Sequence, residues 1–138
     1  MFVYSIRMRL LTPDDGDEYM TPEARGYDTC QLVSRHWRIT KLQEDGGSPV
    51  IEDVRGGGVI GYFPILCDGS YVRMFGNMQY QGRARGAFSY QSCTEADCPG
   101  SIEGSLQFRP MWRDDRPDGD IFDARVDPFP LTYPQFLY

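Results

Sequence analysis

The stretch CQLVSRHWRIT, residues 30–40, decides the fold, because its side chains alternate between apolar and polar as they do in a β-strand. The apolar side chains occupy even positions up to Leu32 and odd positions from Trp37 onward. A strand whose alternation changes midway keeps both halves facing one core only if it carries an extra residue. We therefore expect a β-bulge near Ser34 and Arg35, in a strand whose tryptophan fills the core.

The same two-residue alternation recurs on both sides of this strand. It predicts further strands over residues 2–10, 50–55, 87–93, 101–110 and 121–126. Turns that contain glycine or proline separate them, and Pro64 argues against a helix in the apolar stretch 56–66. About seven short strands separated by turns are typical of an all-β sandwich.

The composition favours a single domain over residues 1–138. With 138 residues, 41% of them apolar, the chain is long enough for one core and too short for a second. Its 20 acidic and 14 basic side chains give a net charge of −6, which disfavours nucleic acid and anionic membrane surfaces as partners. No apolar run approaches the ~20 residues of a membrane span. We therefore expect a soluble, intracellular protein, with the cytoplasm as its compartment.

The four cysteines lack the spacing of zinc ligands. Cys30 and Cys67 lie in apolar stretches and are expected to be buried, whereas Cys93 and Cys98 flank a turn. We expect reduced thiols, as is usual in a reducing compartment, and a disulfide across the turn is the alternative.

Several motifs around the central strand resemble the signature of the ApaG domain family. They are RHWRIT (35–40), VRGGGVIGYFPI (54–65), FSYQSCT (88–94) and GSIEG (100–104), followed by a similar closing strand at 121–131. The motifs follow the family's order along most of the chain. The resemblance implies an immunoglobulin- or fibronectin-III-like β-sandwich, which agrees with the strand pattern.

The same resemblance implies a role in binding. The family occurs as free-standing bacterial proteins linked genetically to cobalt and magnesium homeostasis, and as the C-terminal domain of some F-box proteins. RHW (35–37), GSIEGS (100–105) and DPFPL (127–131) resemble the plant-type F-box relatives more closely. The resemblance therefore implies recognition of a substrate or partner protein in a ubiquitin-ligase adaptor, or a subunit of a larger assembly.

The chain departs from the family pattern at its start. It begins at the family's second strand, so we expect the first strand to be missing and one sheet edge to be open. An open edge is a template for strand addition by a partner.

The second departure is an insertion at residues 71–86, which we expect to be a loop. It carries three arginines and no acid, a local charge of +3 in an acidic chain. Its candidate partner-binding residues are Arg73, Met74, Phe75, Met78, Tyr80, Arg83 and Arg85. Arginine, methionine and aromatic side chains are enriched in protein interfaces, and added loops commonly carry function. A disordered or self-packed loop, and binding to RNA or another polyanion, are the alternatives.

Gly56, Gly58 and Gly61 have the G-x-G-x-x-G spacing of phosphate-binding loops. Pro64 follows where a dinucleotide-binding fold would have a helix, and a tight turn between strands is the structural alternative. The family motif has been proposed to bind pyrophosphate or nucleotide phosphates. Arg55 and these three glycines are therefore a candidate anion site.

The sequence predicts neither a catalytic residue nor a metal site nor a cofactor. His36 is the only histidine and is expected on the solvent side of its strand, away from any nucleophile. The acidic residues Asp14, Asp15, Asp17 and Glu18 lie in an expected surface loop and lack the spacing of a calcium loop. The leading hypothesis is a non-enzymatic protein-interaction domain. The alternative is a small-anion-binding protein linked to cobalt and magnesium homeostasis.

Overall fold

The computed structural model describes residues 2–69, 71–76, 79–94 and 99–131. These residues form nine β-strands joined by turns and loops, with two short helices near the start of the chain. The elements are β1 (Phe2–Met8), η1 (Pro13–Glu18), α1 (Pro22–Arg25), β2 (Thr29–Lys41), β3 (Val50–Gly57), β4 (Ile65–Cys67), β5 (Tyr71–Gly76), β6 (Gln79–Arg85), β7 (Phe88–Thr94), β8 (Gly100–Met111) and β9 (Phe122–Leu131). None of the helices described is long and apolar enough to cross a membrane.

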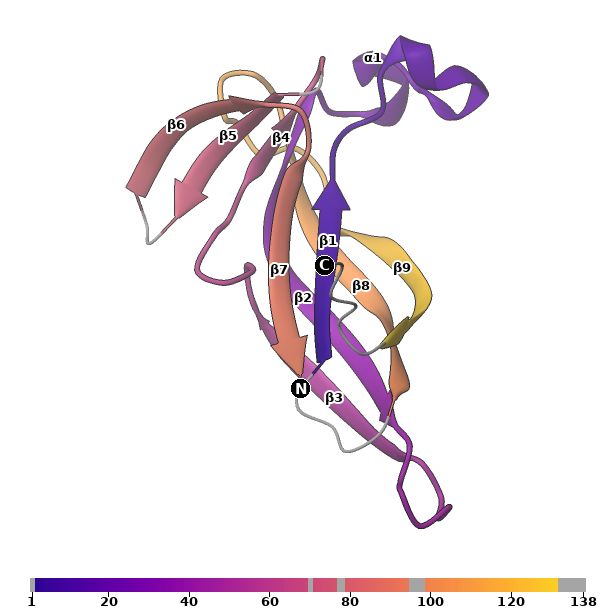
Figure 1. Cartoon of the computed structure of the whole chain (residues 1–138). Helices are drawn as coiled ribbons and strands as arrows, with labels where there is room; N and C mark the ends of the chain where they lie inside the picture. The colour runs from indigo at the N-terminus through magenta and orange to yellow at the C-terminus, as the bar shows by residue number, and fades with distance from the viewer. Residues whose placement is uncertain (1, 70, 77–78, 95–98, 132–138) are drawn as a thin grey trace, which may run out of the picture.

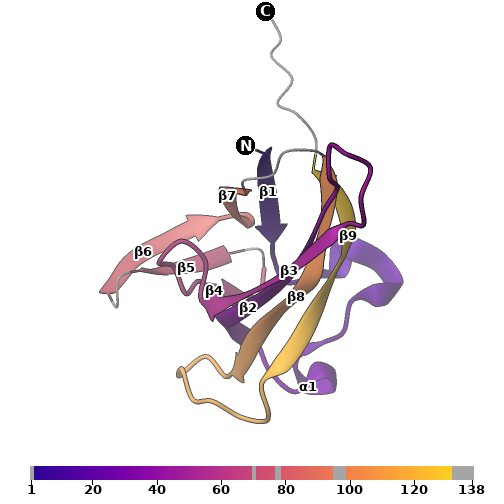
Figure 2. The ribbon, with the colours of Figure 1, turned by 90° about the horizontal axis from the view of Figure 1, so that it is seen from below.

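The strands form two antiparallel sheets, which gives the predicted all-β sandwich (Figure 1). The larger sheet has the strand order β6-β5-β4-β2-β8-β9, with β3 also paired to β2, and the smaller sheet consists of β1 and β7. Figure 2 shows β1 and β7 beside one face of the larger sheet. The described residues contain nine strands where the sequence predicts about seven, and β4, β5 and β6 lie outside the predicted strand ranges.

The central strand β2 holds the larger sheet together. It pairs with β3 and β4 along one edge and with β8 along the other. Its register against β8 shifts between Leu32 and Ser34, which leaves Val33 as the extra residue. The predicted bulge is thereby confirmed, slightly earlier in the strand than expected.

Trp37 lies in the core between the sheets, as predicted, with 2% of its surface exposed. Its ring meets Tyr4 edge-on, with the centroids 6.4 Å apart. Gly104 of β8 is the direct partner of Trp37 in the pairing of β2 with β8. A Cβ atom on Gly104 would lie 3.0 Å from Cε3 of the indole. Gly104 therefore gives the tryptophan room. The other buried core side chains include Phe2, Ile6, Leu32, Ile39, Phe88, Tyr90, Ile102, Leu106 and Phe108.

The acidic segment after β1 forms helical turns instead of the expected loop. η1 begins with a proline after Thr12, and α1 begins with a proline after Thr21, whose hydroxyl accepts a hydrogen bond from the Ala24 N–H. Proline and threonine at these positions favour a helix start, but each helix is too short to show periodicity. The Arg9 guanidinium binds the Asp15 carboxylate at 2.7 Å and holds the pKa of Asp15 well below its usual range.

One edge of β1 is open in the part of the chain that the structure describes. There β1 pairs with β7 alone, while β9 is the outer strand of the larger sheet. An apolar groove runs between them, lined by residues that include Ile6, Met8, Phe122 and Val126.

Candidate functional site

The segment 71–86 is a β-hairpin and not the loop expected from the sequence. β5 pairs with β4 and with β6, so the hairpin extends the larger sheet by two strands (Figure 1). The side chains of β6 are mostly exposed, so its sequence carries no apolar alternation that could predict a strand. Pairing with β5 determines its structure.

Alternation along β5 divides the candidate residues between two faces. Val72 is 1% exposed and belongs to the core, and Met74 packs against the same core. Met74 therefore supports the hairpin from inside instead of facing a partner. Tyr71 and Arg73 lie at the intervening positions, on the outer face.

The outer face of the hairpin gathers arginines around tyrosines. In β6, Arg85 lies opposite Tyr71, and Arg83 lies opposite Arg73. The guanidinium groups of Arg83 and Arg85 lie 5.4 and 5.9 Å from the centre of the Tyr71 ring. Arg73 lies 5.6 Å from the centre of the Tyr80 ring, which is 53% exposed. These distances are those of cation–π contacts, which hold the guanidinium groups over the rings.

Of the candidate residues, the structure thus brings together Arg73, Tyr80, Arg83 and Arg85. Phe75 is half-buried, and Met78 lies outside the described residues. Tyr71 is an addition to the predicted set, since both β6 arginines stack on it. The sequence contained one signal for Tyr71: it lies two residues before Arg73, and residues two apart in a strand lie on the same face.

Arg73 anchors the hairpin to the turn before β9. Its guanidinium forms two hydrogen bonds with the Asp115 carboxylate, one of them 3.0 Å long. The hydrogen bond from Arg73 lowers the pKa of Asp115 below its usual value, and the same bond raises the pKa of Arg73. The ion pair also offsets the repulsion expected between Arg73 and Arg83, which lie directly opposite each other.

The positive charges of Arg83 and Arg85 are not neutralised by an acidic side chain of the described residues. No carboxylate of the described chain lies within ion-pair distance of either side chain, and both side chains are exposed. Beside them a pocket of about 520 Å³ is lined by Tyr71, Tyr80 and Arg83, among others. Guanidinium groups stacked on aromatic rings can donate paired hydrogen bonds to carboxylates of a partner.

The glycine motif lies elsewhere, at the end of β3 and in the turn after it. Arg55 is exposed and pairs with His36 across the β2–β3 ladder. A Cβ atom on Gly58 would lie 2.4 Å from the Tyr62 carbonyl oxygen, and Gly58 has φ +55. Gly61 also has a positive φ, +83. The motif thus satisfies the geometry of a tight turn.

Three backbone N–H groups of this turn donate hydrogen bonds within the protein. Gly58 N–H donates to the Val33 carbonyl at 3.0 Å. Val59 and Tyr62 donate to each other's carbonyl oxygens at 2.9 and 2.7 Å. A phosphate-binding loop instead leaves such groups pointing at the anion. The geometry therefore gives the candidate anion site at Arg55, Gly56, Gly58 and Gly61 no further support.

His36 and the cysteines show no catalytic arrangement in the described residues. Nε2 of His36 lies 2.9 Å from Oδ1 of Asp53, and this hydrogen bond lowers the pKa of Asp53. Cys30 and Cys67 are buried free thiols, as predicted, and burial raises the pKa of Cys30 to about 12. Cys93 is also free, while Cys98 lies outside the described residues. No three His, Cys, Asp or Glu side chains in the described part of the chain are grouped to hold a metal ion.

The sequence of the chain is similar to a known domain family and to several characterised proteins. The ApaG domain matches residues 1–110. The chain is 33% identical over 138 residues to F-box protein SKIP16 of Arabidopsis thaliana, covering 99% of this chain and 26% of that protein. It is 32% identical over 121 residues to Protein ApaG of Aromatoleum aromaticum, covering 87% of this chain and 74% of that protein. It is also 34% identical over 105 residues to human Polymerase delta-interacting protein 2, covering 75% of this chain and 22% of that protein.

One solved structure has a similar fold. The X-ray structure of target SoR45 of the Northeast Structural Genomics Consortium matches with a TM-score of 0.53 and 21% identity, covering 99% of this chain and 87% of that one. The chain spans about a quarter of the F-box relative's length, 26%, but most of the length of the bacterial ApaG protein, 74%. The motifs around β2, the β-sandwich and these matches together assign the chain to the ApaG domain family.

Proposed function

We propose that this chain is a non-enzymatic protein-interaction domain that recognises an acidic surface of a partner protein through the outer face of its β5–β6 hairpin. It acts in substrate or partner recognition, as in an F-box-type ubiquitin-ligase adaptor, or as a subunit of a larger assembly. The observation that carries the proposal is the pair Arg83 and Arg85, stacked on Tyr71 and without an acidic partner in the described chain.

Three features support this proposal. Val72 packs the hairpin into the core, and Arg73 binds it to the turn before β9. These contacts hold the strands that carry the arginines in place. β6 is one of the two outer strands of the larger sheet, and its side chains are mostly exposed, so they can meet another surface. Two of the similar proteins are named as an F-box protein and as an interaction partner of a polymerase, names that point to protein binding.

Affinity purification of the tagged chain from its native cells tests the proposal, with captured proteins quantified by mass spectrometry. The test variant is Arg83→Glu/Arg85→Glu, which reverses both charges on an exposed strand. The matched control is Arg7→Glu/Arg109→Glu, which makes the same change at exposed positions of β1 and β8.

The hairpin variant is expected to lose about tenfold or more of the captured partner, because like charges then face each other across the interface. The control is expected to capture as the unaltered chain does. Equal capture by the hairpin variant, or a loss in the control alone, would contradict the proposal. The second result would point instead to the open edge of β1.

A further inference from the structure

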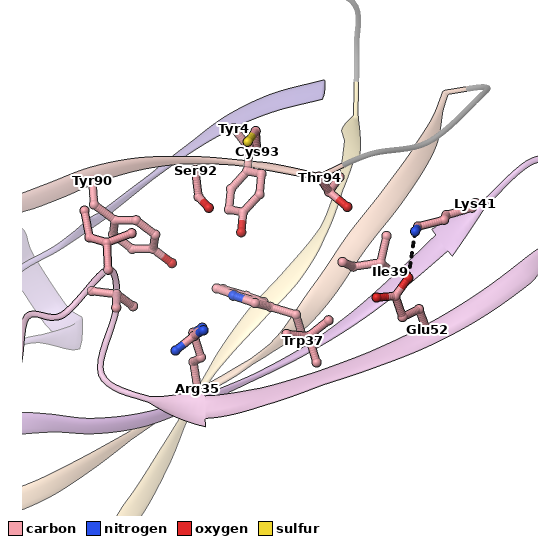
Figure 3. Close-up of a pocket in the computed structure, with 13 residues that line it drawn as sticks. Tyr4, Arg35, Trp37, Ile39, Lys41, Glu52, Tyr90, Ser92, Cys93 and Thr94 are labelled. Carbon is pink, nitrogen blue, oxygen red and sulfur yellow. Dashed lines mark ion pairs between the residues drawn. The ribbon is translucent and has the colours of Figure 1, made fainter. Parts of the chain in front are cut away.

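A second pocket lies between the two sheets, away from the hairpin. It has a volume of about 450 Å³ and is lined by β1 and β7 on one side and by β2, β3 and the turn after β3 on the other (Figure 3). Its polar lining residues include Arg35, Trp37, Tyr90 and Ser92, and its apolar ones include Ile39, Val54 and Val59. The volume is in the range of pockets that bind small molecules.

Two buried side chains of this pocket carry polar groups without partners. Trp37 is 2% exposed and Tyr90 is 5% exposed, and within the described residues neither Nε1 of Trp37 nor the hydroxyl of Tyr90 has a hydrogen-bond partner. Burial raises the pKa of Tyr90, so its hydroxyl stays protonated and can donate. Unsatisfied buried donors are rare because each one costs free energy. Two of them in the lining of one pocket indicate that an acceptor belongs there.

Arg35 adds a charged hydrogen-bond donor to the same pocket lining as Trp37 and Tyr90. Nη1 donates to the carbonyl oxygens of Gly57 and Gly58 at 3.1 and 2.8 Å, which fixes one end of the guanidinium. Nε and Nη2 form no hydrogen bond with the described residues. Figure 3 shows the guanidinium, the indole nitrogen of Trp37 and the Tyr90 hydroxyl directed toward a common space.

The charges in the pocket fit a ligand with a single negative charge. Lys41 is paired with Glu52 at 2.6 Å, so these two side chains neutralise each other. Among the lining residues that the structure describes, Arg35 is left as the one uncompensated charge. A carboxylate carries one negative charge and two acceptor oxygens, which match the fork of a guanidinium. The apolar and aromatic lining suits a hydrophobic group attached to it.

We propose that this pocket binds a carboxylate attached to an apolar or aromatic group, with Arg35, Trp37 and Tyr90 as its donors. The carboxylate belongs either to a free organic acid or to the C-terminus of a peptide. The donors of this site are side chains between the sheets and not the backbone N–H groups of the glycine turn, although that turn lines the pocket. It is also independent of the β5–β6 hairpin, so either proposal can fail without the other.

The two tryptophans of the chain give this proposal an internal control. Nε1–H of Trp37 has no partner, whereas Nε1–H of Trp112 donates to Oδ2 of Asp118 at 2.9 Å, outside the pocket. The indole N–H signals are followed by ¹H–¹⁵N NMR while phenylacetate or N-acetyl-alanyl-phenylalanine is added. The signals are assigned with the variant Trp112→Phe. Phenylacetamide serves as the neutral analogue, and inorganic phosphate as a different anion.

Binding is expected to move the Trp37 signal downfield in a saturable manner and to leave the Trp112 signal in place. The amide is expected to bind at least about tenfold more weakly, because a hydrogen bond to a charged group is the stronger one. Tyr90→Phe, which removes one oxygen atom, and Arg35→Lys, which keeps the charge but loses the fork, are each expected to weaken binding about tenfold. Tyr19→Phe is the matched control, because Tyr19 lines neither this pocket nor the hairpin face, and it should bind as the unaltered chain does.

The two probes distinguish the sources of the carboxylate. Binding of phenylacetate alone supports a free acid, whereas markedly tighter binding of the dipeptide supports a chain end. The proposal is overturned if neither probe moves the Trp37 signal or if both indole signals move together. Phosphate or phenylacetamide binding as tightly as the carboxylates, or unchanged affinity in both Tyr90→Phe and Arg35→Lys, would overturn it as well.

Discussion

A Cβ atom on Gly56 would lie 2.8 Å from Nη1 of Arg35, so the missing side chain of Gly56 provides the space that the guanidinium occupies. The two residues are direct partners across the β2–β3 ladder. From this position Nη1 reaches the carbonyl oxygens of Gly57 and Gly58. The glycine run thus places an arginine between the two sheets, where the second pocket lies.

The glycines of the motif are expected to differ in their tolerance of alanine. Gly58→Ala combines a positive φ with a clash against the Tyr62 carbonyl and should lower the free energy of unfolding by about 2 kcal/mol. Gly56→Ala meets only a flexible arginine and should cost less. Gly46→Ala is the control, since Gly46 has φ +74 but no atom within 4 Å of an added Cβ. Urea unfolding compares the three, and an equal loss in Gly58→Ala and Gly46→Ala would contradict the packing role of Gly58.

Val72 should stabilise the fold as a core residue although it lies in the segment expected to be a loop. Val72→Ala removes two buried methyl groups and is expected to lower the free energy of unfolding by about 1–3 kcal/mol. Val50→Ala makes the same change at a side chain that is 49% exposed and should cost less than about 0.5 kcal/mol. Urea unfolding measures both. Equal effects would show that the hairpin is not packed on the core.

The ion pair of Arg73 with Asp115 should make stability depend on pH in the acidic range. The pKa of Asp115 is lower in the folded chain, so its contribution is present above the unfolded value of about 3.9 and is lost as the pH falls through the folded value. Asp115→Asn is therefore expected to lower the free energy of unfolding at pH 7 by about 0.5 kcal/mol, as is usual for an exposed pair. The difference from the unaltered chain should shrink below about pH 4.

Urea unfolding at pH 7 and at pH 3 measures this dependence. Asp120→Asn is the matched control, because Asp120 is exposed and has no hydrogen bond or ion pair in the described part of the chain. A difference for Asp115→Asn that stays the same at both pH values would rule out the ion pair as its cause.

Removing the unpaired hydroxyl of Tyr90 should stabilise the chain in the absence of ligand. Tyr90→Phe keeps the buried ring and removes a group whose burial without a partner costs about 1–3 kcal/mol. We expect the free energy of unfolding to rise by about 1 kcal/mol, whereas Tyr19→Phe, at a half-buried ring whose hydroxyl forms no hydrogen bond with the described residues, should change little. Thermal and urea unfolding measure the two. A loss of stability in Tyr90→Phe would mean that the hydroxyl has a partner in solution.

The sequence predicts the strands that are buried on one face, because burial imposes alternation. Residues 2–10 and 30–40 show it clearly, and the bulge in β2 follows from the change of alternation between Leu32 and Trp37. β6 escapes prediction because both of its faces are largely exposed and only its pairing with β5 makes it a strand. η1 and α1 escape it because they span six and four residues, too few for a helical period.

The candidate sites, too, could be predicted from the sequence only in part, because the residue types are visible in the sequence and their arrangement depends on strand pairing. Arginines and aromatic residues in 71–86 are visible in the sequence, but their common face depends on the register of β5 and β6. The second pocket could not be predicted, because Tyr4, Trp37 and Tyr90 come from three strands that meet only in the folded chain. The spacing of the glycines suggested a phosphate loop, and in the structure the N–H groups of Gly58 and of its neighbour Val59 donate to carbonyl oxygens of the protein.

Hydrogen exchange of the chain alone and in complex with a partner captured by affinity purification tests the central claim most directly. If the outer face of the hairpin is the interface, amide exchange of β6 should slow on binding, since an exposed outer strand is covered. Exchange of β1 and β9, at the open edge, should stay unchanged. Slower exchange at β1 or β9 with no change in β6 would contradict the account and place the interface at the open edge.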